Sequence, residues 1–192
     1  MDMNSLKGQV REILDLVPRE PGTLLPQGAT EQEIAEFEHV MRFSLPVELK
    51  DWLSSCNGPC VGPGGLYGIA PAPRWLTIED HWEPMPEWKV RGWIPVAGDG
   101  VGNQYILDSH SGSGDQHPIY FLDHEASLLQ PVYIVASNLW QFLRFLLQTE
   151  LDQAQGKRAV WPFQEAVVLT ADPGLEQYRN RVPFPWETSA GE

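Results

Sequence analysis

The chain has 192 residues, 42% of them apolar, and its 26 acidic and 13 basic residues give a net charge of −13. This length suits one domain with an extension, and it can bury a core without disulfides or metals. The charge excludes nucleic acid as an expected partner, because the phosphate backbone would be repelled, whereas a basic protein would be attracted.

The N-terminal segment, residues 1–28, is predicted to be a helix followed by a linker. Asn4 or Ser5 can cap the helix, apolar residues recur at helical spacing from Leu6 to Val17, and Pro18 ends it. The chain start lacks the basic and apolar regions of a signal peptide, and no apolar run approaches the roughly 20 residues that span a bilayer. We therefore expect a cytoplasmic protein with no membrane partner.

Two further helices are predicted before residue 60. The sequence Thr-Glu-Gln-Glu from Thr30 is a capping box, and Ile34, Phe37, Val40 and Met41 follow on one side as far as Phe43. Pro46 suits the first turn of the next helix, which buries Trp52, and Asn57-Gly58 would close it. Cys56 and Cys60 are too few for a disulfide framework or a four-ligand zinc site, and two ordinary thiols are expected rather than a bridge.

The section from Ala70 to Arg91 follows a short strand expected at residues 66–69. It contains four prolines, four acids and three tryptophans. The prolines disfavour strand pairing in a sheet, and the aromatic content is too high for a disordered segment. We predict an ordered excursion over the surface. Trp75, Trp82 and Trp88 can form either an interface or a local core there.

The centre of the chain is predicted to be a small antiparallel meander. Strand-like runs at 93–97 and 105–107 flank turn residues that include Gly98, Gly100, Gly102 and Asn103, the pattern of a hairpin. Further runs follow at 119–123 and 132–136, and the connections are too short for parallel crossovers.

A strongly amphipathic helix is predicted after the strands. Ser137 or Asn138 caps it, and Leu139, Phe142 and Leu147 lie on its apolar face, beside Trp140, which we expect in the core with Trp52. The tail, 151–192, contains another strand-like run at 166–169 and a short helix opened by Asp172-Pro173. We expect this extension to pack on the same domain.

Three patterns could be sites of chemistry, and each has a simpler interpretation. Asp123-His124-Glu125 is favoured as a solvated strand end, because adjacent strand residues point to opposite faces. The pairs Asp108/His110 and Asp115/His117 have metal-compatible side chains, but a Gly/Ser loop holds ligands poorly. The segment 98–103 lacks the Lys-Ser/Thr of a phosphate loop, and no Gly-x-Ser-x-Gly nucleophile motif occurs. We expect no catalytic residues, cofactor or metal, and an enzyme is the least favoured class.

Residues 29–150 resemble the SUKH superfamily, the domain type of the Smi/Knr yeast cell-wall regulators. The resemblance rests on five pieces in one order: residues 30–43, Leu45-Pro46 to Asn57-Gly58, Gly65-Leu66-Tyr67-Gly68, Trp93 to Asp108, and Ile119 to Glu125 with the helix after Ala136-Ser137. It implies a single α+β domain, with a curled, mostly antiparallel sheet packed against several helices. The N-terminal helix, the excursion at 70–91 and the tail depart from the minimal domain.

In bacteria, the resemblance implies an immunity protein that binds and blocks a toxin, often a nuclease or deaminase. The alternative is a non-enzymatic regulatory scaffold that binds endogenous proteins, but such scaffolds usually carry long disordered arms. The chain has no lysine or arginine from 92 to 143, although acidity for solubility alone competes as an explanation of the total charge. Contacts with a basic toxin are therefore predicted, by charge and aromatic character, at Asp80, Trp82, Glu83, Glu87, Trp88, Asp99, Asp108, Asp115, Asp123 and Glu125.

Overall fold

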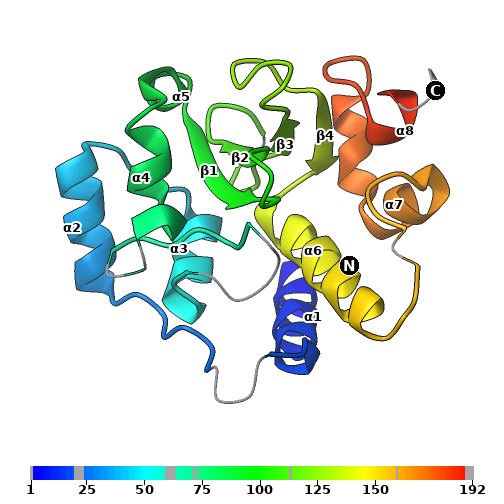
Figure 1. The fold of residues 1–192 in the computed structure, drawn as a ribbon, viewed down its shortest axis with the longest axis horizontal. Coiled ribbons are helices and arrows are strands. Elements are labelled where there is room, and N and C mark those ends of the chain that lie inside the picture. The colour runs from blue at the N-terminus through cyan, green and yellow to red at the C-terminus, as the bar shows by residue number, and fades with distance from the viewer. Residues whose placement is uncertain are drawn as a thin grey trace.

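The structure is a computed structural model that describes residues 2–19, 24–58, 64–70, 72, 74–112, 114–158 and 160–188. In this part of the chain, a four-stranded antiparallel sheet in the order β1-β2-β3-β4 lies among helices (Figure 1). The predicted α+β fold is confirmed. The helices are α1 (Met3–Leu16), α2 (Glu31–Met41), α3 (Val47–Ser55), η1 (Arg74–Leu76), α4 (Ile78–Trp82), α5 (Pro86–Val90), α6 (Leu139–Ala154), α7 (Glu165–Ala171), η2 (Pro173–Tyr178) and α8 (Pro185–Thr188).

The sheet is a meander in which each strand pairs with the next. Its strands are β1 (Trp93–Gly98), β2 (Gln104–Asp108), β3 (Ile119–Leu122) and β4 (Tyr133–Ala136), close to the predicted runs. The register is irregular between Pro95 and Ala97 and again between Ile119 and Tyr120. Because proline has no amide to donate, the first irregularity lies where the ladder is weakest.

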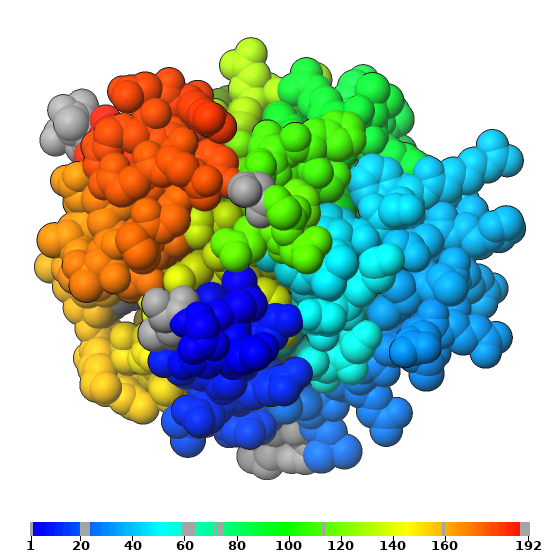
Figure 2. Space-filling model, turned by 180° about the vertical axis from the view of Figure 1, so that it is seen from behind, coloured from blue at the N-terminus to red at the C-terminus, as the bar shows by residue number. Residues whose placement is uncertain are grey.

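Helices cover both edges and one end of the sheet (Figure 1). The short helices α4 and α5 pack against β1, and α6 and α8 contact β4. Helix α1 packs along α6. Figure 2, the view from behind, shows α2 at one edge of the molecule and the C-terminal helices at the opposite edge.

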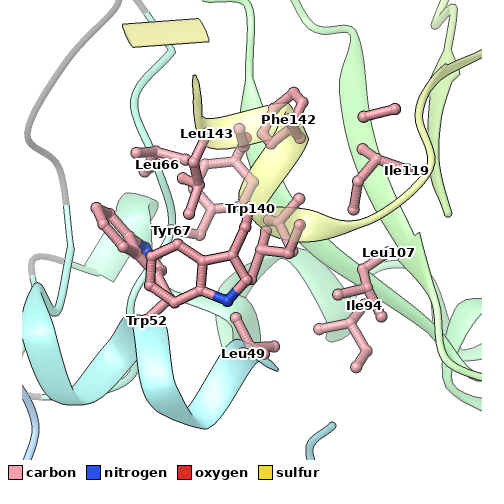
Figure 3. Packing of buried hydrophobic residues seen from close by; sticks show 14 of the residues in the cluster. Leu49, Trp52, Leu66, Tyr67, Ile94, Leu107, Ile119, Trp140, Phe142 and Leu143 are labelled. Atoms are coloured by element: carbon pink, nitrogen blue, oxygen red, sulfur yellow. The ribbon is translucent and has the colours of Figure 1, made fainter. Parts of the chain in front are cut away.

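A single hydrophobic core joins the sheet to the helices. The rings of Trp52 on α3 and Trp140 on α6 meet edge to face, with centroids 6.1 Å apart, and both residues are at most 2% exposed. Figure 3 shows them beside Leu49, with Ile94 and Leu107 of the sheet nearby. The prediction that these two tryptophans are core residues is confirmed.

The helix ends agree with the sequence signals in most cases. The capping box of Thr30 and Glu33 is present, and Asn138 caps α6 by accepting a hydrogen bond from the Gln141 amide. In α1, however, the cap is Asp2 rather than Asn4 or Ser5. Cys56, in an extended conformation, ends α3, so Gly58, at φ 121°, lies beyond the helix end instead of closing it. Residues 59–63, including Cys60, lie outside the described residues, so the thiol prediction stays open.

Three other predictions are wrong in secondary structure. Residues 66–69 form isolated bridges, from Leu66 to Ala97 and from Gly68 to Thr77, instead of a strand. Residues 166–169 belong to helix α7, because a short apolar run has no periodicity that separates strand from helix. The section from 70 to 91 contains α4 and α5 and packs on β1, and is therefore not a surface excursion.

Candidate functional site

Four of the predicted contact residues are exposed acids with no basic partner. Glu83 directly follows α4 and Glu87 lies in α5. Asp115 lies in the loop before β3, and Glu125 follows β3. No lysine or arginine among the described residues forms an ion pair with any of them. Their charges are therefore available to a basic protein.

Two of the predicted acids are used to hold turns. Asp99 Oδ1 accepts hydrogen bonds from the amides of Val101 and Asn103, and its Oδ2 accepts one from the Asn103 side chain at 2.7 Å. Asn103 Oδ1 in turn accepts from the amide and Nδ1 of His124. Asp123 Oδ1 accepts from the Glu125 amide at 2.8 Å. The segment 98–103 is thus a hairpin turn, and Asp123-His124-Glu125 is a turn after β3.

Two other acids also make local hydrogen bonds. Asp108 is only 7% exposed, and its Oδ1 accepts from the His110 amide at 3.0 Å. Asp80 accepts from the hydroxyl of Thr77, the residue that caps α4. These two carboxylates stabilise loop and helix ends, and of the two only Asp108 is buried.

The structure does not bring the predicted acids into one patch. The register pairs Gly98 with Gln104 at one end of the β1–β2 hairpin and Trp93 with Asp108 at the other. Asp99 and Asp123 therefore lie at one end of the sheet and Asp108 at the opposite end. The length of the strands separates Asp99 and Asp123 from Asp108.

The structure places Trp82 and Trp88 in the core instead of at a partner surface. They are 3% and 1% exposed, and their indole nitrogens donate to the carbonyls of Trp93 and Leu128, at 2.7 and 2.6 Å. The Trp82 ring also packs against Phe37 and Phe43. Of the three tryptophans of this section, only Trp75 is exposed, at 74%. The local-core alternative therefore describes Trp82 and Trp88.

A hollow that the sequence did not predict lies between α2 and the segment from Ala70 to Glu79. Its volume is about 390 Å³. Phe37, Val40 and Met41 line it from α2, with carboxylates at Glu33, Glu36 and Glu79. The signal for this hollow in the sequence was Val40, which helical spacing places on the apolar face of α2. In the structure Val40 is 68% exposed. We call this hollow the α2–α4 groove.

A buried polar centre holds the start of α6. Glu48 is 4% exposed and accepts hydrogen bonds from the amides of His117 and Leu139, at 2.8 and 3.0 Å, and from His117 Nδ1 at 3.1 Å. Asp172, 1% exposed, accepts from the amide and hydroxyl of Ser137 at 2.7 and 2.6 Å. Burial raises the pKa of both carboxyl groups despite these bonds.

Two of the four metal-compatible side chains of the 108–117 loop have other roles. His117 bonds to Glu48, and Asp108 bonds to the backbone of His110. Within the described ranges, no three His, Cys, Asp or Glu side chains gather where they could hold a metal ion. Nor does any helix there have the length and apolar character needed to cross a membrane.

The comparison with known families finds a match. The family model described as SMI1 / KNR4 family (SUKH-1) matches residues 28–144, which is more than half of the chain. The matched range runs from the residues before α2 through the sheet into α6, and it includes the α2–α4 groove and the exposed acids. No curated protein matches the chain.

Proposed function

The chain belongs to the SMI1/KNR4 family (SUKH-1), as the resemblance in its sequence predicted, and from this premise we propose that it is an immunity protein. It binds and neutralises a basic bacterial toxin, of nuclease or deaminase type, by protein–protein contact in the cytoplasm and without catalysis of its own. The observation that carries the proposal is the combination of this membership with a net charge of −13 and exposed, unpaired acids.

The charge distribution supports a partner with a basic surface. Glu83, Glu87, Asp115 and Glu125 are exposed and form no ion pair with a lysine or arginine of the described chain. Opposite charges on two proteins accelerate encounter and orient it, and a toxin that acts on nucleic acid carries Lys and Arg in its substrate groove. Blocking that groove with carboxylates would neutralise the toxin.

The test is protection of a sensitive bacterium. The chain is co-expressed with the variable C-terminal toxin domain encoded by the gene immediately upstream of its own. We expect growth to be restored, a stable complex to form between the purified proteins, and association to slow about tenfold or more as ionic strength rises. Growth arrest in spite of good expression would contradict the proposal. A complex with an endogenous protein in its place would support the regulatory scaffold.

A matched pair of variants tests whether the charges act locally. Glu83→Lys with Glu87→Lys is compared with Glu12→Lys and Asp15→Lys, which change two exposed acids on α1 and alter net charge equally. We expect the first pair to slow association several-fold more than the second. Equal slowing would assign the effect to total charge and contradict a contact at α4 and α5.

A further inference from the structure

The α2–α4 groove has an apolar floor that the fold does not cover. Phe37, Val40 and Met41 of α2 form one wall and Ala70 contributes to the other. Val40 is 68% exposed, although its neighbour Phe37 is only 6% exposed and packs on Trp82. At about 390 Å³, the groove is within the range of roughly 300–1,000 Å³ in which proteins hold ligands and side chains.

The rim of this groove is acidic on both sides. Glu33 and Glu36 stand on α2, and Glu79 stands on α4. The Glu33 carboxylate accepts from the amide and hydroxyl of Thr30, and these bonds lower its pKa, so it stays charged. Carboxyl groups on both rims favour a cation between them.

Glu79 has one buried carboxylate oxygen without a hydrogen bond in the described chain, and burial raises the pKa of this carboxyl group. Its Oε1 accepts from the Ala70 amide at 3.3 Å, while its Oε2 is buried and has no hydrogen-bond partner among the described residues. An unpaired buried carboxylate oxygen is costly, and a cationic donor that reached it would recover that cost.

A lysine beside the groove, Lys89, is already engaged in the fold. Lys89 donates to the Met41 carbonyl at the end of α2, and its ammonium lies 5.8 Å from the Trp82 ring centre. A second copy of this chain is a poor occupant, because it carries the same net charge of −13.

We propose that the α2–α4 groove is the docking site for a basic segment of the protein partner, in which a lysine or arginine lies next to an aliphatic side chain. The aliphatic group covers Val40 and Met41, and the cation lies between Glu36 and Glu79. This inference rests on the proposed function and deepens it, because it specifies the chemistry by which the toxin is held.

The first experiment uses a minimal probe, acetyl-leucyl-arginine amide, added to the ¹⁵N-labelled full chain. We expect amide shifts centred on residues 33–41 and 70–79, with weak, saturable binding. The matched control is the citrulline analogue, which has the same shape without the charge. We expect it to bind at least tenfold more weakly, because charge-assisted hydrogen bonds are the stronger ones. Shifts elsewhere in the chain, or equal binding of both probes, would overturn the proposal.

Variants that leave the fold intact sharpen this test. Glu36→Gln and Val40→Ser change exposed side chains on α2, and Glu12→Gln changes an exposed acid on α1 as the control. Each groove variant is expected to weaken binding of the arginine probe several-fold, while the control binds as the native chain does. Self-association of the native chain that Val40→Ser abolishes would assign the groove to a second copy and contradict the proposal.

The same variants separate this inference from the proposed function. If the native chain neutralises the toxin and Glu36→Gln with Val40→Ser neutralises it equally well, the groove proposal fails and the immunity function stands. If the chain protects against no toxin but binds the arginine probe in the groove, the immunity function fails and the docking site stands.

Discussion

The buried polar centre at the start of α6 and the exposed acids of α4, α5 and the loops use the same side chain in opposite ways. Glu48 and Asp172 are at most 4% exposed, and they accept hydrogen bonds from residues distant in the sequence. Glu83, Glu87, Asp115 and Glu125 face solvent and have no such contacts. Carboxylates in the first region stabilise the fold, and those in the second are free to meet a partner. Burial, rather than residue type, separates the two roles.

Glu48→Ala should have the largest effect on stability. It leaves the amides of His117 and Leu139 without an acceptor, and we expect the free energy of unfolding to fall by about 3 kcal/mol. Urea unfolding followed by tryptophan fluorescence measures this change. Glu87→Ala, the exposed control, should change it by less than about 0.5 kcal/mol. Similar losses in both variants would erase the distinction between the two regions.

Asp172→Asn tests the same region by pH. Burial raises the folded-state pKa of Asp172 above its ordinary value of 3.8, although Ser137 and Arg144 oppose the shift. Its contribution to stability is therefore fully present below that value and is lost as pH rises through the raised pKa. We expect the difference in unfolding free energy between the native chain and the variant to shrink as the pH rises above 3.8. Urea unfolding at several pH values measures this difference. A difference that grows with pH would mean that the hydrogen bonds outweigh burial.

Asp99→Ala tests a carboxylate that lies between the two extremes. Asp99 is half-buried and holds the β1–β2 turn through Val101 and Asn103. We expect a loss of about 1 kcal/mol, typical of one local hydrogen-bonded group, and faster hydrogen exchange of the Val101 amide. Unchanged exchange at Val101 would show that the glycines alone set the turn.

The smallest effect on stability is expected from neutralising the exposed acids. Glu83→Gln, Glu87→Gln, Asp115→Asn and Glu125→Gln should each shift the free energy of unfolding by no more than about 0.5 kcal/mol. Thermal unfolding of the single variants measures this. A loss above 1 kcal/mol at any position would assign that acid to the fold and remove it from the proposed partner surface.

Local signals in the sequence predicted most elements because they act over a few residues. The capping box at Thr30, the Asn138 cap and the glycines at 100 and 102, both at positive φ, satisfy backbone groups within one turn. The periodicity of α6 indicates which face of that helix is buried, and the apolar runs of the four strands are almost entirely buried. Signals of this kind can be identified without knowledge of the tertiary contacts, and they predict the helices and the meander.

The roles of the acids and tryptophans were decided by the tertiary structure. Trp82 and Trp88 became core residues because α4 and α5 pack on β1, and Glu48 and Asp172 were buried by partners 69 and 35 positions away in the sequence. The α2–α4 groove likewise exists because two helices far apart in the chain meet without covering Val40. Composition alone established that the chain is acidic. Whether a given carboxylate supports the fold or faces a partner depends on long-range packing, which leaves no local pattern in the sequence.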